Sequence, residues 1–425
     1  MELGVGEPTY RPIERSSRHT SHTMFRLVQR LFWVHRQSIT GMLIWLTLDA
    51  GPAVRLLAAD GSAETKTSEG FAIPRPGRRF EFPRDHGSHP EFKIEWWYVT
   101  GHLYTQARQR YGFQATFFRR SNAKADPNSI SPSIEPGVRQ PFGHPELHLA
   151  HMAISDIKQQ RFLFEERVNR VGWDASADET TLALRNGNWS MRLDTNNTGV
   201  ITLHGSIRAE VSFSLQLSPR KPLVIFGQDG VSRKGAAPAA ASHYLTFPRL
   251  DARGTLSTDG GLQTVTGQAW MDHEISSSQL DQSQEGWDWA SLQLQDGREI
   301  MVYRLRKKGG ATDPHSQLAW IDAQGGIASF PADSFGWKVD GHWTSSKTGA
   351  KYPIQVTLET IDPATNQPKR FQLEPLVVDQ EVCGRLGGVP YWEGACRVRD
   401  ARGAEVGSAY LELTGYAGNL ADQFR

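Results

Sequence analysis

The sequence has few cysteines, which excludes a fold built on several disulfides. Its 425 residues include two, Cys383 and Cys396, and no pair of histidines lies near them to complete a zinc site. In an oxidising compartment these two residues can form one disulfide, and a loop of that size is worth about 3 kcal/mol in the chain-entropy model. Two free buried thiols are the alternative.

The chain also lacks an excess of charge of either sign. Lys and Arg total 47 and Asp and Glu total 46, which leaves a net charge of +1. Nothing in this balance attracts nucleic acid or an acidic membrane surface. We therefore expect no nucleic-acid partner.

Long hydrophobic runs are absent as well. The run Ile39–Leu48 is too short to span a bilayer of about 30 Å. Basic residues from Arg26 to Arg36 precede this run and small residues follow it, which is the layout of a signal peptide. The sequence predicts export, to the periplasm or beyond, with cleavage between Ala53 and Ala59. An uncleaved anchor or a buried segment is the alternative.

Helical periodicity is scarce, and neither a Gly-rich phosphate loop nor a helix–strand alternation occurs. Period-two alternation is common instead, as in 289–303, where Asp296-Gly297 is a strong hairpin signal. Residues 121–145 and 228–242 have no such pattern and are expected to form long loops, of which the first is placed at the mouth of a site. These features predict an all-β fold.

A weak internal duplication suggests two similar domains. The segment Glu95–Tyr98 is followed by the strand-like Tyr111–Arg119, and Trp287–Trp289 is followed in the same way by Gly297–Arg304. We therefore divide the chain into a disordered start, signal peptide and linker (1–70), a first domain (71–275) and a second (276–425). Each domain has a suitable length for a closed antiparallel barrel, whose interior has room for one small ligand.

Tryptophan is abundant, with 13 residues. Some anchor the core, and others are expected to line an apolar binding cavity.

A set of motifs along residues 78–418 resembles the AttH/CrtC-like family, whose members are often described as predicted secreted hydrolases and include carotenoid 1,2-hydratase. The motifs are Phe82–His86, Glu95–Gly101, His151–Asp156, Trp270–Glu274, Trp287–Trp289, Tyr391–Gly394 and Leu411–Tyr416. The resemblance implies two tandem lipocalin-like (calycin) antiparallel β-barrels. Fold alone does not give function, so the site must be argued from its residues.

The resemblance also implies a catalytic acid. In the hydratase, an Asp in a Tyr-x-Asp-His segment protonates an isoprenoid double bond, and aromatic rings stabilise the cation. The matching stretch here is Trp270–His273, with Asp272 as the acid and Trp in place of Tyr. The resemblance also implies that an upstream His of the hydratase corresponds to His243. The hydratase has a Trp near that His, and this chain has Leu245 at the matching position.

The residues themselves make Asp272-His273-Glu274 the densest titratable cluster. Alternation along a strand places Asp272 and Glu274 on one face and His273 on the other. Two carboxylates on one face repel, which raises the pKa of one and suits it to donate a proton. The rings expected around the developing cation are those of Trp270, Tyr244, Trp287 and Trp289. Pairing of both acids with Arg at the junction of the barrels, or a role in ligand binding alone, are the alternatives.

The segment Glu95–Tyr98 has a similar ambiguity. Glu95 and Trp97 should face one way, and Trp96 and Tyr98 the other. Trp96 is expected to close the barrel bottom beneath Arg119 or Arg304. A buried Glu95 needs a partner or a function. We include Glu95, Trp97, Tyr98, Tyr244, His273, Glu274, Trp287 and Trp289 as ligand-binding candidates.

No metal or cofactor is expected. Six histidines could supply ligands, but the spacing of His148 and His151 places them on opposite faces of a strand. No Gly-x-Ser-x-Gly motif supports a serine hydrolase.

The sequence thus predicts an exported protein that binds an apolar, isoprenoid or lipid-like small molecule. It is a hydro-lyase, with Asp272, His243 and Trp270 as catalytic candidates, or a non-catalytic carrier linked to an ABC-type permease system. A hydrolase is less favoured.

Overall fold

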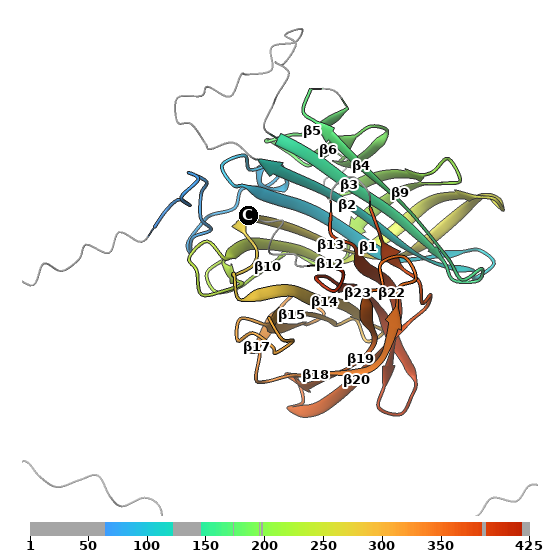
Figure 1. Cartoon of the computed structure of the whole chain (residues 1–425). Coiled ribbons are helices and arrows are strands. Elements are labelled where there is room, and N and C mark those ends of the chain that lie inside the picture. Colours follow the sequence, from blue (N-terminus) through green and yellow to red (C-terminus); the bar gives the residue numbers. More distant parts are fainter. Residues whose placement is uncertain are drawn as a thin grey trace, which may run out of the picture. The chain divides into compact units, whose positions relative to one another are not determined.

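The computed structural model describes residues 64–121, 146–172, 174–194, 196, 199–384 and 388–418 (Figure 1). The expected signal peptide and the expected loop over residues 122–145 lie outside these ranges. The described residues form two antiparallel sheets and one 3₁₀ turn, η1 (Arg84–His86). Among them, no helix is long and apolar enough to cross a membrane.

The first sheet contains thirteen strands, which run from Ile94 to Ser278. They are β1 (Ile94–Thr105), β2 (Arg110–Ser121), β3 (Glu146–Asp156), β4 (Arg161–Arg170), β5 (Ala175–Ala177), β6 (Ala183–Asn186), β7 (Trp189–Leu193), β8 (Ile201–Ile207), β9 (Val211–Pro219), β10 (Val224–Phe226), β11 (Ser232–Arg233), β12 (Ala241–Thr258) and β13 (Gly261–Ser278).

The second sheet contains ten strands, which run from Gln284 to Leu413. They are β14 (Gln284–Leu294), β15 (Glu299–Lys307), β16 (Gln317–Ile321), β17 (Ile327–Pro331), β18 (Gly336–Thr344), β19 (Lys351–Asp362), β20 (Gln367–Pro375), β21 (Glu381–Val382), β22 (Tyr391–Asp400) and β23 (Glu405–Leu413).

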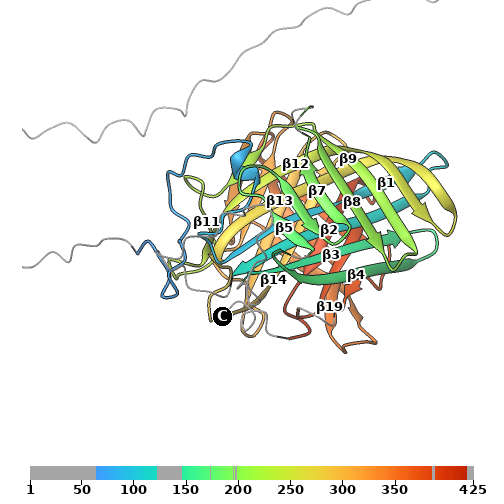
Figure 2. The same cartoon turned by 90° about the horizontal axis from the view of Figure 1, so that it is seen from above.

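The two sheets share a topology. In each, the first long strand pairs with both the next strand and the last, as β1 does with β2 and β13, and β14 with β15 and β23. The first sheet curls until β6 and β8 contact β3 and β4, which nearly closes a barrel (Figure 2). The second forms a half-barrel between the edge strands β17 and β18. The fold is therefore the expected pair of lipocalin-like barrels.

Each barrel is filled by its own apolar core. Trp97 and Trp189 are fully buried in the first, as are Trp320 and Trp392 in the second. A third apolar cluster lies where the outer faces of the sheets meet, and it contains Tyr98, Tyr244, Trp270, Trp289, Tyr303 and Tyr410. Figure 1 shows β1, β12 and β13 above β14, β22 and β23. Bulky side chains thus fill the barrel interiors, so the expected ligand site inside a barrel is wrong. The third, aromatic cluster lies between the barrels.

An arginine covers one tryptophan of each barrel. The guanidinium carbon of Arg167 lies 3.9 Å from the ring centroid of Trp189, and that of Arg298 lies 4.8 Å from Trp320. Such cation–π contacts are worth about 0.5–2 kcal/mol.

Trp96 has neither of the arginines predicted to cover it. Arg119 binds Glu95, and Arg304 binds Asp288. The interpretation of Trp96 as an Arg-covered ring at the barrel bottom is therefore wrong, because both guanidinium groups are used by buried carboxylates.

No disulfide joins the two cysteines, both of which the structure describes. Burial raises the pKa of the Cys396 thiol, which makes it unreactive at neutral pH. Of the two alternatives, a disulfide or two free thiols, the structure has free thiols.

Candidate functional site

A cavity of about 260 Å³ lies between the two barrels, and we call it the interbarrel cavity. Alternation along the strands determines its walls, because the side chains that do not enter a barrel core face the opposite sheet. Its wall is mainly apolar and aromatic and includes Trp96, Tyr98, Phe118, Tyr244, Trp287, Trp289, Tyr303 and Tyr391. Four carboxyl groups also line it: Asp272 and Glu274 from β13, Glu393 from β22 and Glu412 from β23.

Asp272 is held in the wall by three neutral donors. Thr246 Oγ1 and Trp270 Nε1 donate to Oδ1 at 2.6 and 2.8 Å, and the Tyr244 hydroxyl lies 2.9 Å from Oδ2. Trp289 Nε1 donates in turn to that hydroxyl at 2.9 Å. Among the described residues, no cation lies within ion-pair distance of Asp272.

The environment of Asp272 favours its protonated form. Burial raises the pKa of Asp272 to about 7, against the opposing effect of its hydrogen-bond donors. A proton held on this carboxyl group can be transferred to a molecule in the cavity, which Asp272 lines. The group is therefore suited to act as a general acid near neutral pH.

Glu274 differs from Asp272 because it has a cation. Lys234 Nζ lies 3.5 Å from Glu274 Oε2, and the Ser242 hydroxyl donates to the same oxygen. The alternative that both acids pair with Arg at the barrel junction is therefore wrong, since Glu274 pairs with Lys234 and Asp272 with no cation among the described residues.

The second barrel contributes two carboxyl groups that the sequence reasoning missed. Glu393 and Glu412 are direct cross-strand partners on β22 and β23. Tyr98 donates to Glu393 Oε1 at 2.5 Å, and Trp287 Nε1 donates to Glu412 Oε1 at 3.1 Å. Burial, with the neighbouring acids, raises the pKa of Glu412 to about 8 and that of Glu393 well above its usual range.

Both residues lie in motifs already singled out, Tyr391–Gly394 and Leu411–Tyr416. The signal that could have found them is the alternation that places Tyr391 with Glu393, and Tyr410 with Glu412, on one face of their strands.

His151 and Tyr391 form a further pair in the wall. The rings stack at a centroid distance of 5.8 Å, and His151 Nδ1 lies 2.8 Å from the Tyr391 hydroxyl. Gln114 donates to the same hydroxyl at 3.0 Å. Burial lowers the pKa of His151 to about 4, so the imidazole is neutral and can accept a hydrogen bond from the Tyr391 hydroxyl.

Six of the residues predicted for the site line the cavity: Asp272, Glu274, Tyr98, Tyr244, Trp287 and Trp289. Trp270 is buried beside them and contributes its indole N–H to Asp272. His243 faces away from the cavity, where its ring packs edge-on against Phe80 and Phe92.

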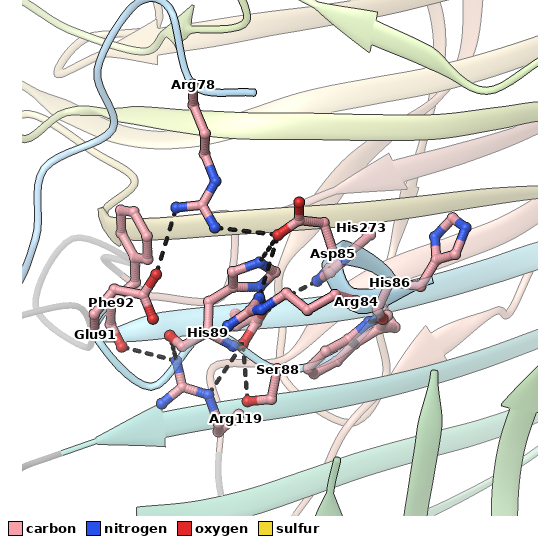
Figure 3. A network of polar contacts seen from close by, with 12 residues as sticks. Arg78, Arg84, Asp85, His86, Ser88, His89, Glu91, Phe92, Arg119 and His273 are labelled. Carbon is pink, nitrogen blue, oxygen red and sulfur yellow. Dashed lines mark hydrogen bonds and ion pairs between the residues drawn. The ribbon is translucent and has the colours of Figure 1, made fainter. Parts of the chain in front are cut away.

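Glu95, Trp97 and His273 lie on the opposite face of β1 and β13 and are buried there. Figure 3 shows His273 beside His89 and Asp85 of the segment around η1. His89 Nδ1 and His273 Nε2 lie 2.7 and 2.9 Å from Glu95 Oε1, and Arg119 Nε donates to Oε2 at 3.1 Å. The Trp97 ring stacks on His273 with centroids 4.6 Å apart. The partner that a buried Glu95 needed is therefore present.

This network holds the segment that precedes β1. His89 Nε2 lies 2.9 Å from Asp85 Oδ1, so the His89 ring bridges two carboxylates. Although burial opposes it, hydrogen bonds from His89 and Glu81 help to lower the pKa of Asp85 to about 2. His273 and His89, with the charge of Arg119, likewise hold the pKa of Glu95 well below its usual range, despite burial.

The ligand atoms of His89, Glu95 and His273 lie within 4.8 Å of one another, a grouping compatible with a metal ion. Glu95 already has the charge of Arg119 beside it and accepts hydrogen bonds from the Ser88 hydroxyl and the His89 backbone. The carboxylate is therefore satisfied by protein groups, and the arrangement is explained as an anchor for the segment before β1.

A family model described as AttH-like matches residues 73–416. The chain belongs to the AttH-like family. No curated protein gives a significant match to this AttH-like protein. A solved AttH structure from Nitrosomonas europaea is 33% identical, covers 81% of this chain and 99% of its own, and superposes with a TM-score of 0.70.

Kievitone hydratase from Nectria haematococca shares the fold at lower similarity. It is 13% identical, covers 84% of this AttH-like protein and 96% of its own chain, and has a TM-score of 0.58. The likeness covers most of both chains and shows that the fold is shared.

Proposed function

We propose that this AttH-like protein binds an apolar, isoprenoid or lipid-like molecule in the interbarrel cavity and adds water to one of its double bonds. The observation that carries the proposal is Asp272, a buried carboxyl group among aromatic rings with a pKa raised to about 7. Such an acid is costly to bury and is suited to proton donation. The fold shared with kievitone hydratase supports the same reaction class.

The reaction balances with Asp272 and one water molecule. The π electrons of the double bond take the proton from Asp272 Oδ2, which forms a C–H bond and leaves a cation on the neighbouring carbon. The faces of Trp289 and Tyr98, which meet edge to face with centroids 5.3 Å apart, stabilise that cation. Water then adds to the cation, and its proton returns to the Asp272 carboxylate.

The size of the cavity constrains the substrate. A volume of about 260 Å³ is slightly below the range of about 300–1,000 Å³ found for drug-sized ligands. A long isoprenoid would therefore place only its reacting end between the barrels.

The test begins with native mass spectrometry of the protein purified from its own host, to identify a molecule that co-purifies. With that molecule as substrate, Asp272→Asn should reduce kcat by about 10²–10⁴-fold, because general acid catalysis typically contributes that much. Binding of the substrate should persist. The half-exposed Asp379→Asn is the matched control. Unchanged turnover by Asp272→Asn would remove the acid from the mechanism.

A second candidate is a non-catalytic carrier of a lipophilic molecule in the periplasm or outside the cell, associated with an ABC-type transport system. The mainly apolar wall of the interbarrel cavity favours it, because such a wall alone suffices for binding. A carrier should release its ligand chemically unchanged, and Asp272→Asn should then have no effect beyond binding.

A further inference from the structure

The second barrel presents two carboxyl groups to the interbarrel cavity, and among the described residues no cation is paired with either. Glu393 and Glu412 face each other across β22 and β23, a position in which like charges are destabilising. Both line the cavity, and among the described residues no Lys, Arg or His forms an ion pair with either. Neither carboxyl group takes part in the hydration proposed above.

The hydrogen bonding of the Glu393 carboxyl group is incomplete. Glu393 is fully buried, and its Oε2 has no hydrogen-bond partner. The donors that the two carboxyl groups do have, Tyr98 and Trp287, are neutral. A buried polar oxygen without a partner is destabilising, so Glu393 Oε2 is suited to accept a hydrogen bond from a ligand.

The walls of the same cavity already hold an ammonium group. Lys234 Nζ lies 3.9 Å from the ring centroid of Tyr303 and 4.7 Å from that of Tyr244, beside Glu274. An aromatic wall next to carboxyl groups is the arrangement that recognises organic cations. Glu393 and Glu412, with the rings of Tyr98 and Trp287, form a similar arrangement of carboxyl and aromatic groups that contains no lysine.

We infer that Glu393 and Glu412 form a subsite for the protonated amine of a ligand whose apolar body fills the rest of the interbarrel cavity. A primary ammonium group has three N–H donors, which match Glu393 Oε2, the Glu412 carboxylate and an aromatic face. This inference rests on the proposed function only for the location of the ligand site. It does not depend on the chemistry at Asp272.

Binding of an ammonium group displaces protons from this pair. Burial holds both carboxyl groups in their neutral form near pH 7, and an adjacent cation favours the ionised form. The titratable groups on their own strands that interact with them are Tyr391, Tyr410 and Cys396. Those facing them from the first barrel are Tyr98, Asp272 and Glu274, with Lys234 and His151 also in the cavity wall.

The experiment compares n-octylammonium with 1-octanol by isothermal titration calorimetry on the full chain at pH 7. We expect the ammonium to bind at least about tenfold more tightly, because it gains ion pairs that the alcohol lacks. Titration in buffers of different ionisation enthalpy should show protons released with the ammonium and none with the alcohol. This measurement needs no variant.

Variants then locate the subsite. Glu393→Gln and Glu412→Gln, each checked for unaltered melting, should weaken octylammonium binding about tenfold or more and leave octanol binding unchanged. The exposed Glu359→Gln is the matched control. Equal affinity for alcohol and ammonium, or octylammonium binding that survives both substitutions, would overturn the inference.

The two proposals fail separately. Asp272→Asn should keep the preference for the ammonium while losing turnover. An enzyme that hydrates its substrate but does not prefer the ammonium would refute the subsite and leave the acid in place.

Discussion

Asp272 is a residue whose burial opposes stability. Its pKa of about 7 in the folded protein exceeds the ordinary value of 3.8, so the folded chain holds a proton that the unfolded chain releases above about pH 4. The contribution of Asp272 to the free energy of unfolding therefore falls as the pH rises from about 4 to about 7. Functional sites commonly carry such a cost.

Asp272→Asn should relieve that cost. Asn keeps an oxygen for Thr246 and Trp270 and places its amide against the Tyr244 hydroxyl, but it cannot ionise. The stability of the variant relative to the wild type should increase by up to about 1.4 kcal/mol for each pH unit between 4 and 7. Urea denaturation at pH 5, 6 and 7 measures the difference.

The half-exposed Asp379→Asn, at a residue paired with Lys347 outside the interbarrel cavity, is the matched control for replacing an Asp by Asn. A difference that stays constant with pH for Asp272→Asn would mean that Asp272 is already ionised in the folded protein.

At the scale of the strand, β13 is fixed closely against β1. Gly267 pairs with Leu103 of β1 and Ala252 of β12, and a Cβ atom there would lie 1.8 Å from the backbone oxygen of His102. The strands must separate to admit it. This contact holds the sheet face on which Asp272 and Tyr98, also cross-strand partners, meet the cavity.

Gly267→Ala should therefore destabilise the protein by about 1–3 kcal/mol, the usual cost of overpacking. Gly388→Ala is the comparison, because within the described part of the chain, its immediate neighbours aside, no atom lies within 4 Å of the added Cβ. Chemical denaturation should show a change of no more than about 0.5 kcal/mol for that variant. Equal losses of stability in the two variants would show that the close β1–β13 contact does not cause the destabilisation.

Strand alternation explains how much of the site the sequence could predict. It correctly separated Trp96 and Tyr98 from Glu95 and Trp97, because this depends only on the pleat. It could not say which face meets the second barrel, since that contact joins residues hundreds of positions apart. The expected ligand site inside a barrel, and the omission of Glu393 and Glu412, have this one cause.

At the scale of the whole molecule, the two barrels share their apolar and ionic contacts. The third aromatic cluster contains residues of both sheets, and Glu299, at the start of β15, binds Lys221 and Arg249 of the first barrel. Glu299 is fully buried, so this ion triad is shielded from solvent. A second ion pair, Arg110 with Glu405, joins the barrels at 3.1 Å on the exposed rim.

These two links should differ strongly in their contribution to stability. Glu299→Ala leaves Lys221 and Arg249 without their carboxylate and should cost about 3–5 kcal/mol, whereas Glu405→Ala should cost less than about 1 kcal/mol because water screens the rim pair. Since the barrels share one apolar interface, differential scanning calorimetry should show a single transition that moves as a whole to lower temperature in Glu299→Ala. Two transitions, of which only one moves, would mean that each barrel folds independently, and the interbarrel cavity would then be a docking surface between autonomous units instead of part of one cooperative structure.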